Sequence, residues 1–333
     1  METEQSDIME QIQTFRPNLK ASTIKQYYHQ LKKLQARLKY DNLEFLLNAD
    51  DTIQKINKLT SDKNPTELLH FTSKRNIYNP VILYLLALDK DKNIIKKYEI
   101  ERDKLNNQYQ DEQLTGKISS KQGANFVHID DIKKMIDTIK TELKPNLKSN
   151  SLSYSQMGLL KAYTLFEILI RFPTRNDLAG LLLITPSLFK KLTEEDKKNN
   201  NYIVRAKPSS YFVWNEFKTD KKYQSISENI PKDLEKIINT YIKQNNYKSG
   251  DIIFNFTRNG LSQILLNTSA KYLGGIKLST TMIRKSYLSS KYSDIKKEQD
   301  KDATIMKHSV ETANKIYIKD KDDFVKVNAQ SQE

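Results

Sequence analysis

The chain of 333 residues contains no cysteine, only 8 glycines and 8 prolines, and no apolar run of membrane-spanning length. The absence of cysteine excludes disulfides, thiolate nucleophiles and zinc–thiolate sites. The scarcity of glycine and proline favours helices over a turn-rich all-β fold. The acidic, polar start of the chain does not resemble a secretion signal, so we expect an intracellular protein.

Positive charge is in surplus. The 55 lysines and arginines outnumber the 41 aspartates and glutamates, which gives a formal net charge of +14. Such a surplus suits a polyanionic partner, and nucleic acid is the commonest one. A soluble protein that is merely basic has the same composition, so charge alone leaves both interpretations open. The length is sufficient for two domains.

The first half of the chain has the pattern of a small helical domain. Residues 1–17 are predicted to be a polar leader. Apolar residues three to four positions apart, from Ile24 to Leu38, then predict the first helix. Further helical patterns occupy 43–48, 51–59 and 73–88, with Pro80 expected near a helix start or kink. The hydrophilic stretch 90–125 predicts a long solvated helix followed by a linker. We therefore expect a helical domain at 1–115 and a linker at 116–127.

The second half, residues 128–318, is predicted to be a second and mostly helical domain, followed by a tail at 319–333. Aromatic and β-branched residues alternate in 200–230, which predicts a small antiparallel sheet. Asp130 and Asp131 are expected to cap a helix. The fold class is therefore mainly α, with a small sheet (α+β). The predicted helices of this half are 130–143, 155–171, 231–244, 259–270, 279–291 and 303–317.

Four segments of the second half carry candidate chemistry, although each has an ordinary structural explanation when taken alone. Arg175 follows the most hydrophobic predicted helix and could be a solvated helix end. Lys218 lies in a lysine-rich turn of the kind that is usually solvated. Arg284 lies in a basic first turn of a helix. His308, one of 4 histidines, precedes Tyr317 by nine residues, and a lone histidine is more often structural than catalytic.

Taken together, in order and approximate spacing, these segments resemble the catalytic domain of the tyrosine recombinase (phage integrase) family. The variant is similar to those of large DNA viruses and eukaryotic mobile elements. The family order is arginine, a hairpin lysine, His-x-x-Arg, a second histidine or tryptophan, and tyrosine. The five residues Arg175, Lys218, Arg284, His308 and Tyr317 match that order. The resemblance covers about 125–318 well, and the first domain only in general character.

The resemblance implies a reaction and a role for each matched residue. Tyr317 is expected to attack a DNA phosphate and form a 3′-phosphotyrosyl intermediate, in a metal-independent transesterification that needs no cofactor. Arg175 and Arg284 are expected to bind the non-bridging oxygens, because guanidinium groups bind phosphate bidentately. Lys218 is expected to protonate the leaving 5′-oxygen, and His308 either to assist removal of the Tyr317 proton or to donate to the phosphate.

Three positions depart from the family pattern. Thr281 replaces the histidine of His-x-x-Arg, where it has at most a supporting role. Lys307 stands where glycine usually precedes the second histidine. Asp177 lies one residue earlier than the usual acidic position. These departures put catalytic efficiency in doubt more than the fold.

The resemblance also implies partners. We expect double-stranded DNA to be bound by a homotetramer acting on two sites, with no membrane and no small-molecule cofactor, wherever the target DNA is located. The residues expected to contact DNA are Lys25, Lys32, Lys33, Lys74, Arg75, Lys221, Lys222 and Lys285.

Three other hypotheses remain open at this stage. A type IB topoisomerase has a closely similar active site. A non-catalytic DNA-binding protein on a degenerate recombinase scaffold would explain Thr281 and Lys307. An unrelated basic helical protein would explain the composition alone.

Overall fold

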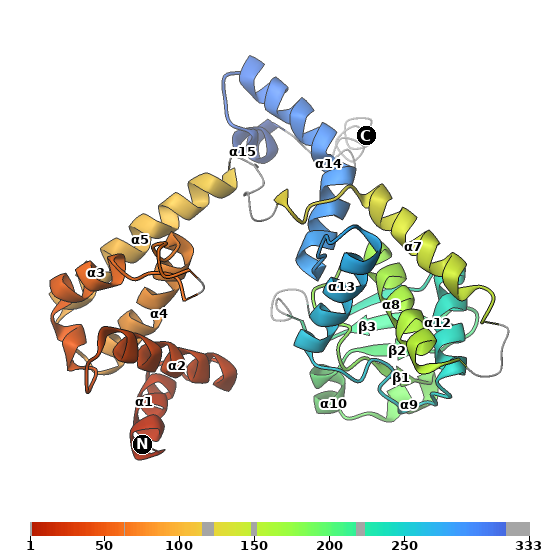
Figure 1. Cartoon of the computed structure of the whole chain (residues 1–333), viewed down its shortest axis with the longest axis horizontal. Helices are drawn as coiled ribbons and strands as arrows, with labels where there is room; N and C mark the ends of the chain where they lie inside the picture. Colours follow the sequence, from red (N-terminus) through yellow and green to blue (C-terminus); the bar gives the residue numbers. More distant parts are fainter. Residues whose placement is uncertain (1, 63, 115–122, 148–151, 218–223, 318–333) are drawn as a thin grey trace, which may run out of the picture. The chain divides into compact units, whose positions relative to one another are not determined.

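The computed structural model describes residues 2–62, 64–114, 123–147, 152–217 and 224–317. It divides into two compact units, residues 1–118 and 119–333, which are described separately (Figure 1). Among the described residues, no helix is both long and apolar enough to cross a membrane. The prediction of a mainly helical fold with one small sheet is confirmed.

The first unit is entirely helical in its described part, apart from an isolated β-bridge between Thr60 and Leu68. Its core is built by apolar side chains from every helix, and α4 packs closely along α5. Pro80 lies inside α4, and its side chain is buried. The elements are α1 (Glu2–Phe15), α2 (Ala21–Leu38), η1 (Glu44–Leu47), α3 (Ala49–Asn57), α4 (Phe71–Ala87) and α5 (Lys92–Leu114).

The prediction of a polar leader at 1–17 is wrong. Residues 2–15 form α1, which packs against α2 and α4. Ile8 and Ile12 are 4% and 0% exposed, so this helix contributes to the core of the first unit. Two buried apolar residues four positions apart are enough to attach a helix, but they leave the sequence polar on average.

Ile12→Ala is therefore expected to lower the free energy of unfolding of the first unit by about 2–4 kcal/mol, because a fully buried isoleucine loses packed methyl groups. Glu10→Ala, on an exposed position of the same helix, serves as the matched control. Urea unfolding monitored by circular dichroism measures both. A loss no larger for Ile12→Ala than for the control would show that α1 does not belong to the core.

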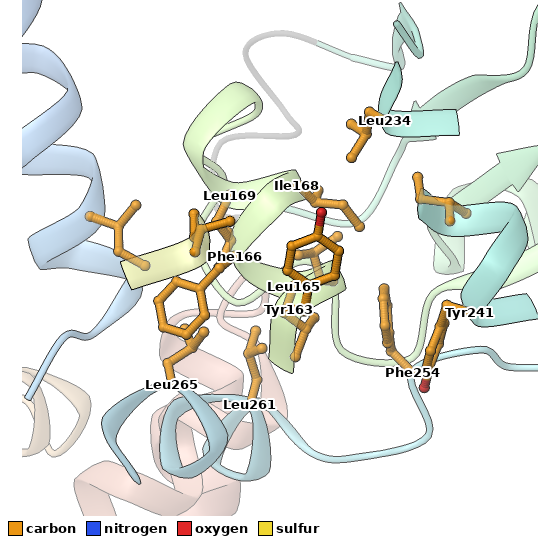
Figure 2. Packing of buried hydrophobic residues seen from close by; sticks show 14 of the residues in the cluster. Tyr163, Leu165, Phe166, Ile168, Leu169, Leu234, Tyr241, Phe254, Leu261 and Leu265 are labelled. Atoms are coloured by element: carbon orange, nitrogen blue, oxygen red, sulfur yellow. The ribbon is translucent and has the colours of Figure 1, made fainter. Parts of the chain in front are cut away.

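The second unit is centred on α8, which is buried along most of its length (Figure 2). Side chains of α8 such as Phe166 and Leu169 share one hydrophobic core with Leu261 and Leu265 of α13. A complete capping box at Ser153 and Gln156 fixes the start of this helix. The helices are α7 (Ile129–Leu143), α8 (Tyr154–Arg171), α9 (Pro186–Lys191), α10 (Glu194–Asn199), α12 (Lys232–Gln244), α13 (Arg258–Tyr272), α14 (Thr280–Ile305) and α15 (Val310–Thr312), followed by a π-helical turn, η2 (Ala313–Tyr317).

The sheet has four strands in the order β1-β2-β3-β4: β1 (Leu182–Ile184), β2 (Tyr202–Val204), β3 (Tyr211–Trp214) and β4 (Ile226–Asn229). The antiparallel pairing of β2, β3 and β4 confirms the predicted sheet. The added strand β1 is parallel to β2, so the sheet is mixed rather than purely antiparallel. Successive residues point to opposite faces. Phe212 and Trp214 thus join the main core, while Val213 joins a smaller cluster with Phe189 of α9.

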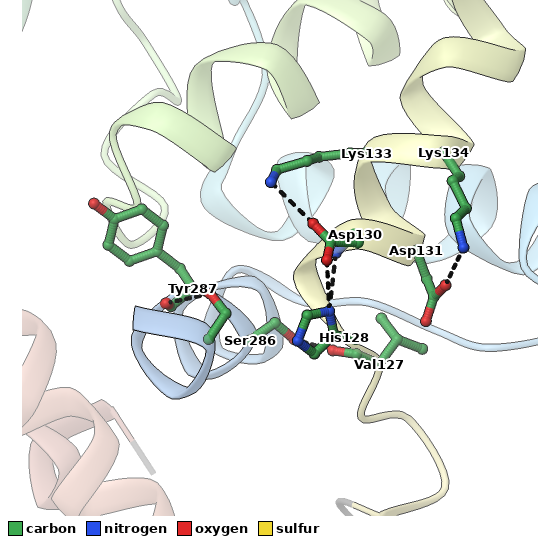
Figure 3. A network of polar contacts seen from close by, with 9 residues as sticks. Val127, His128, Asp130, Asp131, Lys133, Lys134, Ser286 and Tyr287 are labelled. Atoms are coloured by element: carbon green, nitrogen blue, oxygen red, sulfur yellow. Dashed lines mark hydrogen bonds and ion pairs between the residues drawn. The ribbon is translucent and has the colours of Figure 1, made fainter. Parts of the chain in front are cut away.

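The start of α14 is anchored to the segment that enters α7 (Figure 3). The hydroxyl of Ser286, which is 1% exposed, donates a hydrogen bond of 2.6 Å to the carbonyl oxygen of Val127. His128, rather than the predicted aspartates, caps α7, since its Nδ1 accepts from the backbone N–H of Asp130. Asp130 and Asp131 instead pair with lysines one turn later. The helix predicted at 279–291 corresponds to α14, which begins within one residue of the predicted start but continues to Ile305.

Candidate functional site

Arg175 lies in the loop that follows α8, and a buried carboxylate holds its backbone. Oδ2 of Asp177 accepts a hydrogen bond of 3.1 Å from the backbone N–H of Arg175. Asp177 is only 9% exposed, whereas Arg175 is exposed. The Asp177 carboxylate therefore fixes the Arg175 loop from its buried side, and the Arg175 side chain lies at the surface.

The Arg175 loop is joined to the first turn of α14 by a bond between residues 104 positions apart. Oγ1 of Thr280 donates to Oδ1 of Asn176 at 2.9 Å, and Nδ2 of Asn176 donates to Oγ of Ser262 on α13 at 3.3 Å. Residues four apart on a helix share a face, so Thr280 and Arg284 lie one above the other. The Asn176–Thr280 bond therefore brings Arg284 beside Arg175.

The electrostatics of Arg284 agree with this arrangement. Partial burial lowers the pKa of the Arg284 guanidinium, the positive charge of Arg175 lowers it further, and Asp177 acts in the opposite direction. Arg171 and Arg258 pair with carboxylates, but in the described part of the chain neither Arg175 nor Arg284 forms a salt bridge. Two neighbouring guanidinium groups without a paired carboxylate form a site suited to a phosphate.

Asp177 itself carries a stability cost. Burial raises the pKa of its carboxyl, and the backbone N–H of Arg175 and the charges of Arg258 and Arg175 oppose this shift only in part. A carboxyl with a raised pKa in the folded protein destabilises the fold once it ionises. Its contribution to stability is therefore present below the ordinary pKa of 3.8 and is lost as the pH rises through the raised folded value.

Asp177→Asn keeps an oxygen that accepts from Arg175 but removes the charge. The free energy of unfolding of the natural chain, minus that of the variant, is expected to fall as the pH increases from below 3.8 toward neutrality, and then to level off. Urea unfolding at a series of pH values measures the difference. A difference that grows with pH would mean that the neighbouring arginines stabilise the Asp177 carboxylate more than burial destabilises it.

His308 and Tyr317 form a second group. Their rings stack with centroids 5.1 Å apart and an interplanar angle of 15°. Ser309 caps the short helix between them by accepting from the backbone N–H of Thr312 at 3.1 Å. Nε2 of His308 is buried and has no hydrogen-bond partner among the described residues. Tyr317 is 62% exposed, so most of this residue lies at the surface of the described chain.

Lys307 adopts a backbone conformation that is usual for glycine. Its φ angle is +58°, in the left-handed region where a glycine has no steric cost. The backbone N–H groups of Lys307 and His308 bond to the carbonyl oxygens of Thr304 and Ala303, which closes the end of α14. Lysine therefore preserves the turn at a small conformational cost.

The two groups lie at opposite ends of α14. Arg284 is in the second turn of this helix, whereas His308 and Tyr317 follow its last residue, Ile305 (Figure 1). The helical rise between positions 284 and 305 is about 32 Å. Side chains from 288 to 298 are all exposed. The structure thus brings Arg175 and Arg284 together, and His308 and Tyr317 together, but it does not bring the two groups together.

The remaining residues proposed from sequence have mixed surroundings. Lys25 and Thr281 are exposed, while Lys32 and Lys285 are half-buried. Three basic residues are engaged within the first unit: Lys33 pairs with Asp62 at 2.6 Å, Lys74 donates to the carbonyl oxygen of Asn57, and Arg75 lies over the ring of Tyr109. Lys218, Lys221, Lys222 and the tail at 319–333 lie outside the described residues.

Sequence reasoning missed two residues beside the arginine pair. Arg258, at the first position of α13, pairs with Glu216 at 2.7 Å and acts electrostatically on Asp177. Asn201, which is buried, bonds to the backbone of Asp177 and of Glu216. Neither belongs to a recognisable motif, and only the fold brings them to this place.

No protein-family model matches the sequence, and no curated protein matches it. Among solved structures, a crystal structure of XerA recombinase is similar. The match covers 98% of the present chain and 99% of the XerA chain. The sequence identity is 12% and the TM-score is 0.32. A similarity at this level carries no inference about chemistry.

Proposed function

We propose that this protein is a site-specific DNA strand transferase that cuts and rejoins DNA through a phosphotyrosyl intermediate, with Tyr317 as the nucleophile. The observation that carries the proposal is the convergence of Arg175 and Arg284 through the Asn176–Thr280 bond, since neither guanidinium is ion-paired with a carboxylate of the described residues. A phosphate with two non-bridging oxygens fits two guanidinium groups. The order of the motif residues along the chain supports DNA as the source of that phosphate.

The proposed reaction needs little beyond these side chains. The phenol oxygen of Tyr317 bonds to phosphorus, the bond from phosphorus to the 5′-oxygen breaks, and the strand keeps a 3′-phosphotyrosyl link. Arg175 and Arg284 stabilise the charge that develops on the phosphorane. A phenol has a pKa of about 10 and needs a proton acceptor at neutral pH. His308, stacked on the Tyr317 ring, is the proposed acceptor, and Lys218 the proposed donor to the 5′-oxygen, with Thr281 in a supporting role.

Double-stranded DNA is the proposed partner of both units. The first unit, with the proposed DNA-binding domain 1–115, supplies Lys25 and its basic neighbours as phosphate contacts, which give affinity and salt dependence but little sequence information. The second unit, with the proposed catalytic domain 128–318, supplies the arginine pair. The surplus of positive charge over the whole chain supports this assignment.

A second copy of the chain completes the site in this proposal. The rise of α14 places its last residue, Ile305, about 32 Å along the helix axis from Arg284, and Tyr317 of the same chain follows that far end. The tyrosine of one copy is therefore proposed to attack the phosphate held by Arg175 and Arg284 of another. Such an exchange of tyrosines fits an assembly of four copies on two DNA sites. Each copy gives its tyrosine to a neighbour, and the assembly is then closed and symmetric.

Mixing two inactive variants tests this arrangement. Arg284→Ala lacks the phosphate clamp and Tyr317→Phe lacks the nucleophile, so each alone is expected to give almost no covalent adduct. Their mixture is expected to regain adduct formation, with the DNA attached only to the Arg284→Ala copy. A size tag on one variant and denaturing electrophoresis identify the attached copy. A mixture as inactive as its components would show that each chain uses its own tyrosine.

The chemistry itself is tested with a DNA duplex nicked close to the cleavage site, so that the short cleaved strand diffuses away and the adduct accumulates. A covalent DNA–protein adduct is the expected result. DNA binding without any adduct would instead support a non-catalytic DNA-binding protein. Adduct formation and relaxation of supercoiled DNA by a monomer, with no need for a second site, would support a type IB topoisomerase.

A further inference from the structure

Asn176 joins three segments of the second unit through a single amide group. Its Oδ1 accepts a hydrogen bond of 2.9 Å from Oγ1 of Thr280, the first residue of α14. Its Nδ2 donates to Oγ of Ser262 on α13 at 3.3 Å. Because Asn176 directly follows Arg175 in the sequence, this amide connects the Arg175 loop to both helices.

The hydrogen bonds around Asn176 continue in one direction into α13. Oγ of Ser262 accepts from Asn176 and donates in turn to the carbonyl oxygen of Arg258 at 3.2 Å. Thr280, which is 6% exposed, therefore donates into a chain of three hydrogen bonds. Each bond in such a chain strengthens the next, so the chain gives the Arg175 loop, α13 and α14 a well-defined spacing.

The spacing that Asn176 sets is also the spacing of the two guanidinium groups. Asn176 is the neighbour of Arg175, and Thr280 lies one helical turn before Arg284 on the same face of α14. The start of α14 has a separate anchor, the bond from Ser286 to the segment that enters α7. Loss of the Asn176–Thr280 bond is therefore expected to leave α14 folded and attached, and to loosen only the distance between the guanidinium groups.

We infer that Asn176 is a positioning residue for the strand-transfer reaction, because it holds the two guanidinium groups at the spacing that the bound phosphate requires. This rests on the proposed function, in which Arg175 and Arg284 stabilise the phosphorane. Asn176 itself touches no DNA in this account. Donors stabilise developing charge only where they meet the oxygens that carry it, so a small displacement of either guanidinium slows the reaction.

Two substitutions at Thr280 separate the hydrogen bond from the bulk of the side chain. Thr280→Val keeps the shape of the side chain but removes the hydroxyl that donates to Asn176. Thr280→Ser keeps the hydroxyl and removes only a methyl group. A defect in strand transfer is therefore expected for the valine variant, and nearly natural activity for the serine variant.

The experiment compares these variants on two nicked DNA substrates. The first has the natural phosphodiester at the cleavage site. In the second, a methyl group replaces one non-bridging oxygen, so the group to be cleaved is neutral and its phosphorane carries one negative charge less. In both substrates the phenol oxygen of Tyr317 bonds to phosphorus and the 5′-oxygen leaves. The neutral substrate therefore depends much less on two aligned guanidinium groups.

Thr280→Val is expected to slow adduct formation on the phosphodiester by about 10- to 100-fold, since a displacement of about 1 Å can cost about 10²-fold in rate. The rate on the neutral substrate is expected to change much less, so the ratio of the neutral rate to the charged rate increases. Arg284→Ala sets the largest ratio that loss of a guanidinium produces. Thr280→Ser is expected to keep the ratio of the natural chain.

Thr164→Val is the matched control for a general loss of stability. Thr164 is fully buried in α8, and its hydroxyl donates to the carbonyl oxygen of Leu160 in the same helix. Its rate ratio is expected to equal that of the natural chain. If Thr280→Val does not fold, as judged by thermal unfolding, Asn176→Ala removes the same hydrogen bond from the other partner and is measured in the same way.

A raised ratio in Thr280→Val, with a natural ratio in Thr280→Ser, supports the inference. An unchanged ratio in Thr280→Val overturns it, whether or not both rates fall, since the Asn176–Thr280 bond would then serve only the fold. A ratio raised equally by both variants also overturns it, because the methyl group and not the hydroxyl would then set the spacing. Failure of the proposed function looks different. In that case the natural chain gives no adduct on either substrate, and the inference about Asn176 falls with it.

Discussion

Tyr317→Phe is expected to abolish formation of the covalent DNA–protein adduct and to leave the affinity for DNA nearly unchanged. The substitution removes one exposed hydroxyl and keeps the ring that stacks on His308, so the end of α14 is expected to fold as before. Without the nucleophilic oxygen no bond to phosphorus can form. Denaturing electrophoresis of the nicked substrate measures the adduct, and a gel-shift titration at fixed salt measures the affinity.

Tyr292→Phe is the matched control for this prediction. Tyr292 lies on the exposed part of α14 and is 45% exposed, but it follows no histidine motif. Its adduct yield is expected to equal that of the natural chain. An adduct that persists in Tyr317→Phe and disappears in Tyr292→Phe would move the nucleophile to Tyr292 and remove the basis for the His308–Tyr317 assignment.

Arg284→Lys is expected to lower the cleavage rate at saturating DNA by about 10²- to 10³-fold, the usual cost of losing one donor to a developing oxyanion. A lysine keeps the charge but replaces the planar fork with a single ammonium group, which cannot bind two phosphate oxygens in parallel. The dissociation constant for DNA is expected to change only a few fold, because other basic residues also hold the backbone. Single-turnover rates and binding isotherms separate the two quantities.

Lys285→Ala provides the contrast on the neighbouring position. As a proposed contact to the DNA backbone, Lys285 is expected to affect affinity and its salt dependence, and to leave the cleavage rate at saturating DNA unchanged. If Arg284→Lys weakens binding and cleavage by equal factors, Arg284 is an ordinary DNA contact rather than part of a phosphate clamp. The same comparison applies to Arg175→Ala.

The spacing of apolar residues predicted the helices that bury one face along most of their length. α7, α8 and α12 each carry apolar residues at helical spacing over four or more positions, and their bounds agree with prediction to within one residue. α1 escaped prediction because its buried face is small and depends on α2 and α4. β1 escaped because three apolar residues have no period, and their strand conformation depends on pairing with β2.

The candidate site was predictable in its residue types but not in its geometry. Arg175 and Arg284 stood out through the order of a family motif, and the Asn176–Thr280 bond that joins their segments spans 104 positions. Asn201 and Arg258 have no motif, so only the fold connects them with the arginines. The distance between Tyr317 and the arginine pair follows from the length of α14, whose charged second half has no apolar face to mark where the helix ends.

The most direct test of strand transfer through Tyr317 is to isolate the adduct formed by the natural chain on nicked DNA and to identify the attached residue by mass spectrometry after proteolysis and nuclease digestion. The expected result is a peptide in which Tyr317 is the modified residue and carries a nucleotide through a 3′-phosphate. The absence of any covalent adduct, or a nucleotide attached to a different residue, would contradict it.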